Sequence, residues 1–157
     1  MEVLGVEHID LTVNQLARST AFYTTVLGAL GFERFRHPDQ HASWSNGKLS
    51  ITIRPAPNEL ADAAFNRYRV GLHHLAFKMK QRAHIDSLHQ LLVDHGFAVL
   101  DPPNEYPEYG SGYYAVFFSD PDGLKLEAVH FPWGYWKKVQ TEGSDPRPRY
   151  EPPARSG

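Results

Sequence analysis

The sequence predicts an α+β protein built from two βαβββ modules. Segments in which apolar and polar residues alternate, as in strands with one buried side, surround two segments of helical periodicity. The order of one strand, one helix and three further strands occurs twice. His74 follows His8 by 66 positions, and Gly96-Phe97 follows Gly31-Phe32 by 65 positions. This nearly constant offset indicates an internal repeat, so both halves are expected to share one fold.

The first module begins with an alternating strand at residues 6–13. Ile9, Leu11 and Val13 lie on one side of it, and His8, Asp10 and Thr12 lie on the other. A helix is expected over Arg18–Gly28, because apolar residues recur there at helical spacing before a glycine. Three strands follow at Glu33–Arg36, Ala42–Ser45 and, after an Asn46-Gly47 turn, Lys48–Arg54.

The second module repeats this order with a strand at Leu72–Met79 and a helix at His84–His95. By alternation, His73 is expected to point toward the helix and His74 away from it. A final hairpin joins Tyr113–Ser119 to Leu124–His130 through the turn Asp120–Gly123.

The register of this hairpin decides which side chains lie beside Glu127. If the turn is tight, Ser119 pairs with Leu124 and Val116 faces Glu127. Tyr114 and Phe118 then share the side of Glu127 as well, whereas a slip of one residue would bring Tyr113 there instead. Tyr114 is the candidate catalytic residue, to orient a substrate oxygen or act as an acid; the alternative is a packing role.

Length and charge favour one domain that binds small molecules. With 157 residues and 17.8 kDa, a single domain is expected over 1–131, with modules at about 4–55 and about 70–131. Sixteen Lys and Arg against eighteen Asp and Glu give a net charge of −2, which argues against nucleic acid or an acidic membrane as a partner.

Two features that the sequence lacks, a long apolar run and cysteine, narrow the possible classes of protein further. No apolar run approaches the ~20 residues of a membrane span, and residues 1–3 do not begin a signal peptide, so a cytoplasmic protein is expected. The chain has no cysteine, which excludes disulfides and thiolate sites, and any metal must be held by His and carboxylate side chains.

Residues 132–157 differ in composition from the rest of the chain. They hold five of the twelve prolines and few apolar side chains beyond Gln140. The segment Phe131–Trp136 is strongly aromatic, so we expect it to anchor a Pro-rich, extended C-terminal tail. Its apolar area also predicts a homodimer.

Three residues are the candidate metal ligands. His8 and His74 lie on the polar sides of the first strands of their modules, and Glu127 lies on the polar side of the last strand. Modules paired about a pseudo-twofold axis would bring the two histidines face to face. Two imidazoles and one carboxylate fill about half of the coordination sphere of a divalent ion, and the open positions would accept substrate, water or dioxygen.

Three motifs together resemble the vicinal oxygen chelate superfamily, which includes glyoxalase I, extradiol dioxygenases and bleomycin-binding proteins. They are Val6-Glu7-His8-Ile9-Asp10-Leu11, His74-Leu75-Ala76-Phe77 and the run from Asp120 to Glu127. The resemblance implies paired βαβββ modules, a cupped mixed β-sheet and a metal in the cup, with ligands at His8, His74 and Glu127. Members of this family commonly form dimers.

A fourth ligand known in glyoxalase-type relatives has no counterpart. The repeat aligns Ser50 with Glu127, and no carboxylate lies near it. Three ligands with an open face favour Fe(II) or Mn(II), with Zn(II) or Ni(II) as alternatives. Ser50, Thr52, Val116 and Phe118 are the candidate substrate-pocket residues.

The resulting functional prediction is a divalent-metal-dependent enzyme for a small substrate with vicinal oxygens. Extradiol-type cleavage of a catechol-like compound is the first choice, because three protein ligands leave room for two substrate oxygens and dioxygen. A glyoxalase-like lyase or isomerase is the second. A metal-free protein that binds a drug or metabolite is the third, and metal analysis separates it from the other two.

Overall fold

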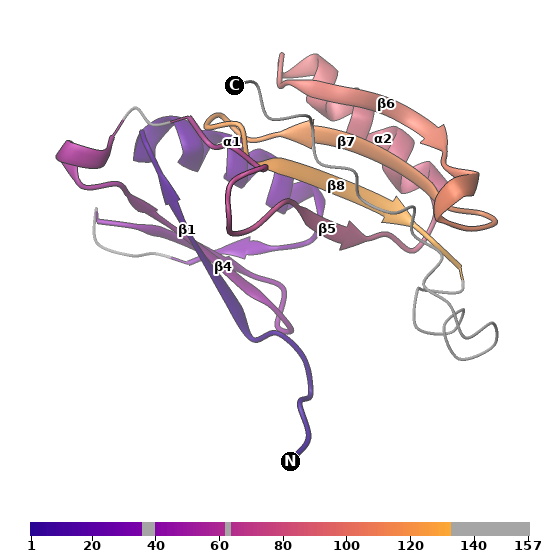
Figure 1. Ribbon diagram of the computed structural model, residues 1–157, viewed down its shortest axis with the longest axis horizontal. Helices are drawn as coiled ribbons and strands as arrows, with labels where there is room; N and C mark the ends of the chain where they lie inside the picture. The colour runs from indigo at the N-terminus through magenta and orange to yellow at the C-terminus, as the bar shows by residue number, and fades with distance from the viewer. Residues whose placement is uncertain (36–39, 62–63, 133–157) are drawn as a thin grey trace. The chain divides into compact units, whose positions relative to one another are not determined.

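A four-stranded mixed sheet and one helix form each of two units in the computed structural model, which describes residues 1–35, 40–61 and 64–132 (Figure 1). Of the described residues, those of 1–65 and 120–124 form the first unit, and 66–119 with 125–132 form the second. The α+β class and the two βαβββ modules are therefore confirmed. Most of the predicted aromatic anchor and all of the tail beyond Pro132 lie outside the described residues.

The first module is a sheet in the order β1-β4-β3-β2, with β1 and β4 parallel. Its elements are β1 (His8–Val13), α1 (Leu16–Ala29), β2 (Glu33–Arg34), β3 (Ala42–Ser45) and β4 (Ser50–Pro55). α1 contacts β2, β3 and β4. Val26 and Leu27 of the helix and Trp44, Ile51 and Ile53 of the strands are buried, as expected where an apolar helix face covers the β-branched side of a sheet.

The second module repeats this arrangement in the order β5-β8-β7-β6, with β5 and β8 parallel. Its elements are β5 (Leu75–Lys78), α2 (Arg82–Asp94), β6 (Val99–Glu105), β7 (Tyr114–Ser119) and β8 (Lys125–His130). Ile85, Leu88 and Leu92 form the buried face of α2, which contacts β6, β7 and β8. In the described part of the chain, neither helix has the length and apolar character needed to cross a membrane.

The hairpin between β7 and β8 differs from the predicted register by one residue. Ser119 pairs with Lys125, not Leu124, and Glu127 therefore pairs with Phe117, not Val116. The reason is the turn, which closes on Asp120 and Leu124 with three residues between them. Gly123 adopts φ +92°, a left-handed conformation that favours glycine, and it adds the extra residue to the loop.

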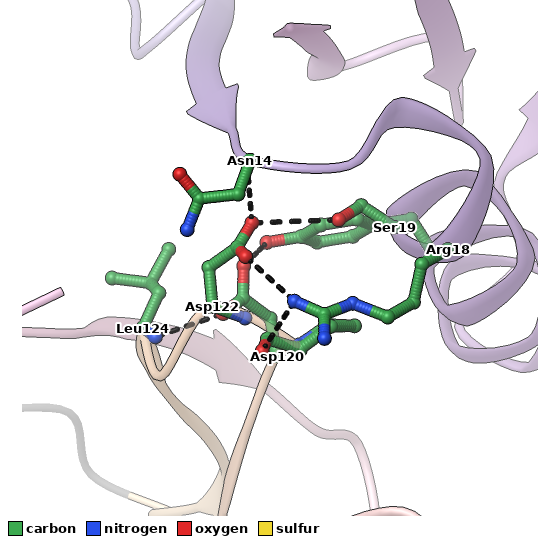
Figure 2. Close-up of polar contacts among 8 residues, drawn as sticks. Asn14, Arg18, Ser19, Asp120, Asp122 and Leu124 are labelled. Atoms are coloured by element: carbon green, nitrogen blue, oxygen red, sulfur yellow. Dashed lines mark hydrogen bonds and ion pairs between the residues drawn. The ribbon is translucent and has the colours of Figure 1, made fainter. Parts of the chain in front are cut away.

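The hairpin turn binds the beginning of α1, far away in sequence (Figure 2). The Asp122 carboxylate accepts hydrogen bonds from the backbone N–H of Asn14 at 3.0 Å and from Arg18 Nη2 at 2.9 Å, and the Ser19 hydroxyl lies 3.5 Å from it. The N-cap residue of α1, Gln15, makes no side-chain cap hydrogen bond. Asp122 thus supplies the negative charge that a helix N-terminus favours, from a turn more than 100 residues away.

A second carboxylate, Asp120, shapes the turn from inside. Its Oδ1 accepts the backbone N–H groups of Asp122 and Leu124, and its Oδ2 accepts the hydroxyl of Tyr23 at 2.8 Å. Burial raises the pKa of the Asp120 carboxyl, and these hydrogen bonds act in the opposite direction. Burial, and then the charge of Asp120, raises the pKa of Tyr23 well above its ordinary value, so the phenol remains the donor.

Candidate functional site

One side of the second sheet carries two of the predicted metal ligands. The register pairs Ala76 with Glu127 and Lys78 with Val129 between β5 and β8, and Phe117 with Glu127 between β7 and β8. Directly paired residues project to the same side of a sheet, so these five residues share one side, which we call the glutamate side. The alternation of the sequence predicted this side correctly for β5 and β8.

Glu127 is the centre of the glutamate side. Its side chain is only 2% exposed, and its two carboxylate oxygens have separate partners. Oε2 lies 3.3 Å from Nε2 of His74, and Oε1 accepts a short hydrogen bond from the hydroxyl of Tyr113. A buried carboxylate is tolerated only where such partners replace water, so this arrangement holds Glu127 in one orientation.

The pair formed by His74 and Glu127 fits a divalent metal. Donor atoms 3.3 Å apart can share one ion at metal–donor distances of about 2.1 Å. One imidazole nitrogen and one carboxylate oxygen are borderline-to-hard donors, which suit Fe(II), Mn(II), Zn(II) or Ni(II). The side chain of His74 is about one-third exposed, whereas that of Glu127 is buried. The imidazole of the pair is therefore open to solvent and the carboxylate is not.

His73 lies beside His74 rather than on the helix side of the sheet. Its Nδ1 is 2.8 Å from Nδ1 of His74, and the two rings meet edge to face. β5 begins only at Leu75, so the strand alternation that predicted opposite directions does not apply to residues 73 and 74. Burial first, and then the charges of His74, Arg67 and Lys125, lower the pKa of His73, which favours the neutral ring.

Tyr114 does not lie on the glutamate side. Its hydroxyl donates to Oδ1 of Asp86 on α2 at 2.7 Å, and Arg82 stacks over its ring at 5.1 Å. Tyr113 occupies the position beside Glu127 because of the one-residue shift at the turn. The predicted placement of Tyr114 is therefore wrong, and the alternative that a slip would bring in Tyr113 is correct.

Val116 and Phe118 follow Tyr114 onto the helix side. Both are completely buried, and they alternate with residues of the glutamate side along β7. Their expected position in a substrate pocket with Glu127 is wrong for the same reason, the longer turn. The glutamate side instead holds an aromatic and apolar cluster, composed of Tyr113, Ala115, Phe117, Val129 and Phe131, with Tyr106 and Tyr109 packed against it.

His8 lies in the first module, at the start of β1. The register places Ser50 opposite His8 and Thr52 opposite Asp10, so these four residues share the polar side of that sheet, as the alternation of β1 predicted. The His8 ring is exposed and contacts the carboxylate of Glu7, and this hydrogen bond and charge raise the pKa of the imidazole.

Thr52 and its neighbours form a small polar network on the same side of the first sheet. The Thr52 hydroxyl is 2.8 Å from that of Ser43, and both residues are buried. Asp10 pairs with Arg54 at 3.0 Å. Within residues 1–35, 40–61 and 64–132, no three His, Asp or Glu side chains gather into a group that could hold a metal. Of the three predicted ligands, His74 and Glu127 contact each other there.

Two residues near Glu127, His73 and Lys125, were not among the candidate site residues, and Tyr113 entered only as the alternative to Tyr114. The Lys125 ammonium lies 3.8 Å from the centroid of the Phe117 ring, on the glutamate side. Its position two residues before Glu127 placed it on the correct side of the strand, but nothing in the pattern indicated a role. Recognising the three-residue turn would have selected Tyr113 over Tyr114.

Comparison with known proteins places these features in a family. A protein of uncharacterised function from Bacillus subtilis (strain 168), YqjT, is 33% identical over 122 residues, which are 78% of this chain and 95% of that protein. The solved structure of a glyoxylase/bleomycin resistance protein/dioxygenase domain from Frankia sp. EAN1pec has 29% identity and a TM-score of 0.71, and the match covers 85% of this chain and 96% of that chain.

A more distant relative has a defined activity. Catechol-2,3-dioxygenase of Bacillus subtilis (strain 168) is 27% identical over 120 residues, which are 76% of this chain but 39% of that enzyme. The model of the Glyoxalase/Bleomycin resistance protein/Dioxygenase superfamily matches residues 5–128, which cover both modules from β1 into β8. The chain therefore belongs to this superfamily, also called the vicinal oxygen chelate superfamily.

Proposed function

We propose that this protein is a metal-dependent enzyme that acts on a small substrate with two neighbouring oxygen atoms. The observation that carries the proposal is the buried carboxylate of Glu127, held 3.3 Å from the imidazole of His74 on the side of the sheet away from α2. His8 is the proposed third ligand, on the strength of its matching place in the repeat. Fe(II) or Mn(II) is the favoured ion.

A bound ion of this kind would act as a Lewis acid toward the substrate oxygens. The protein's own residues orient the carboxylate of Glu127 and limit the access of water to its hydrogen bond. Tyr113 holds Oε1 of Glu127 and leaves Oε2 directed at His74, so the carboxylate is oriented before any ligand arrives. Tyr106, Tyr109 and Phe131 surround Tyr113 and limit access of water to this hydrogen bond.

Extradiol-type oxygenation of a catechol-like compound is the proposed reaction. Two lines support it: the ligand set of two histidines and one glutamate leaves several positions open, and the chain is similar to a catechol-2,3-dioxygenase over 76% of its length. A homodimer remains part of the proposal, on the aromatic segment that begins at Phe131.

A second candidate function is favoured by one feature of the site. Tyr113 and His74 already satisfy both oxygens of Glu127 within the described residues, so the carboxylate is stable without an ion. This arrangement also suits a protein that binds a small metabolite without metal. A lyase or isomerase reaction is a third possibility, which the experiment below distinguishes.

The test uses protein purified without oxygen and loaded with Fe(II) or Mn(II). Oxygen uptake is measured with catechol and 4-methylcatechol, and conversion of a hemithioacetal is measured in parallel. The proposal predicts oxygen uptake by the loaded protein and its loss in Glu127→Gln, which keeps the shape but removes the charge. Hemithioacetal conversion without oxygen uptake would favour the lyase, and ligand binding without metal would favour the binding protein.

A further inference from the structure

Two cations flank the proposed metal ligands and lack a carboxylate partner in the described part of the chain. Lys125 projects from β8 onto the glutamate side, two residues before Glu127. Arg67 lies in the segment before β5, where its guanidinium stacks on Tyr68 at 4.9 Å and donates to the Tyr68 hydroxyl at 2.7 Å. Among residues 1–35, 40–61 and 64–132, neither cation forms an ion pair within 4.0 Å.

The two cations belong to one cluster. From Arg67, contacts run through Tyr68 to His73, whose ring centroid lies 6.1 Å from that of Tyr68. They continue from His73 to His74 at 2.8 Å, and from His74 to Glu127 at 3.3 Å. The charges of Arg67 and Lys125 both lower the pKa of His73, so both cations lie near the pair formed by His73 and His74.

Lys125 is held in a defined place. Its ammonium lies over the face of the Phe117 ring, and Phe117 is the direct partner of Glu127 in the sheet. Glu127 follows Lys125 by two positions in the strand, which is about 7 Å along β8. A half-buried ammonium without a carboxylate partner is costly, and an anion from outside the chain would relieve that cost.

We propose that Lys125, with Arg67, binds a carboxylate carried by the substrate, at a subsite next to the metal ligands. This inference rests on the proposed function for the position of the reacting oxygens, but the anion subsite itself requires only Lys125 and Arg67. The substrate class is then a vicinal diol or related oxygen pair on a ring that also bears a carboxylate. Lys125 is a specificity-determining residue in this account, not a catalytic one.

The experiment compares two probes that share a diol and differ in charge, 3,4-dihydroxybenzoate and 4-methylcatechol. Binding to Mn(II)-loaded protein is measured by calorimetry for the parent, Lys125→Met and Lys125→Arg. Loss of one charge-assisted hydrogen bond is expected to lower the affinity of Lys125→Met for 3,4-dihydroxybenzoate by about tenfold or more. Its affinity for 4-methylcatechol should stay within about twofold, and Lys125→Arg should retain most of the affinity for the acid.

Controls separate this inference from the proposed function. Lys78→Met removes an exposed lysine from the same side of the sheet and should leave both affinities unchanged. Arg67→Gln, at a half-buried position outside the strands, should weaken the acid selectively even if Lys125→Met fails to fold.

Benzoate is the probe for the metal-free protein. If it loses affinity in Lys125→Met while no metal is bound by the parent, the subsite is correct and the metal-dependent function is wrong. Equal loss for the acid and the neutral diol in the lysine and arginine variants, or no loss for either, would overturn the carboxylate subsite.

Discussion

Replacing Asp122 with alanine tests how the turn of the β7–β8 hairpin stabilises the first module. The side chain of Asp122 is only 9% exposed and bonds to the N–H of Asn14 at 3.0 Å and to Arg18 at 2.9 Å. Loss of a helix-terminal acceptor costs about 1 kcal/mol. The ion pair adds about 1 kcal/mol, discounted because Arg18 is about half exposed, and the loss of this acceptor by the part-buried N–H of Asn14 adds up to about 1 kcal/mol more.

The expected loss in the free energy of unfolding is therefore about 2–3 kcal/mol, or about 4–12 °C in Tm for a chain of this size. Thermal and urea unfolding followed by circular dichroism measure it. Asp122→Asn keeps one oxygen for the Asn14 amide and should lose about half as much. Glu105→Ala removes an exposed ion pair with Arg82 and should cost less than about 1 kcal/mol. If Asp122→Ala is as stable as Glu105→Ala, the turn does not stabilise α1 as argued.

Three further predictions concern the site and the turn. Tyr113→Phe should weaken Mn(II) binding by about 10-fold or more, because Glu127 loses the donor that orients it, while Tyr114→Phe should stay within about twofold in the same titration; equal effects would contradict the assignment. Burial raises the pKa of Asp120 in the folded protein, so its protonated form stabilises the fold below about pH 3.9 and this contribution is lost as pH rises through the folded pKa. Asp120→Asn does not titrate, so the difference in the free energy of unfolding between parent and variant, measured with urea, should be smaller at pH 7 than at pH 4. A difference that does not depend on pH would refute this. Chelation of the bound metal should lower the Tm of the parent but not that of Glu127→Gln, because an ion that binds only the folded state stabilises it; identical shifts would show that the ion binds elsewhere.

Local periodicity was sufficient to predict the modules and the sides of their strands. Alternation in β1 placed His8 and Asp10 on one side, and the register with Ser50 and Thr52 agrees with it. A period of two is robust because each residue of a strand must face either the helix or the opposite side. The repeat then carried the same reasoning from the first module to the second.

Which side chains of β7 lie beside Glu127 depends on the length of the hairpin turn, and the sequence pattern did not show that this turn is one residue longer than expected. A shift of two residues in the pairing of β7 with β8 would have left Tyr114 on the same side of the sheet as Glu127. A shift of one residue moves every side chain of β7 to the opposite side of the sheet. Backbone and side-chain hydrogen bonds of Asp120 and the positive φ of Gly123 decide that shift.

Long-range polar contacts were also beyond sequence reasoning. Asp122 binds Asn14 across 108 positions, and no local pattern in either segment indicates the other. His73 shows the related limit at a strand end, because alternation predicts direction only where the backbone is extended in the sheet, and β5 begins two residues later.

The metal content of the purified protein tests the central proposal most directly. Anaerobically prepared protein is equilibrated with Fe(II), Mn(II), Zn(II) and Ni(II) in turn, and bound metal per chain is quantified for the parent and for His8→Ala, His74→Ala and Glu127→Gln. We expect about one ion per chain in the parent and a sharp loss of affinity in every variant, because two protein ligands rarely hold such an ion. A parent that binds none of the four ions, or a His8→Ala variant that binds as tightly as the parent, would contradict the proposed site.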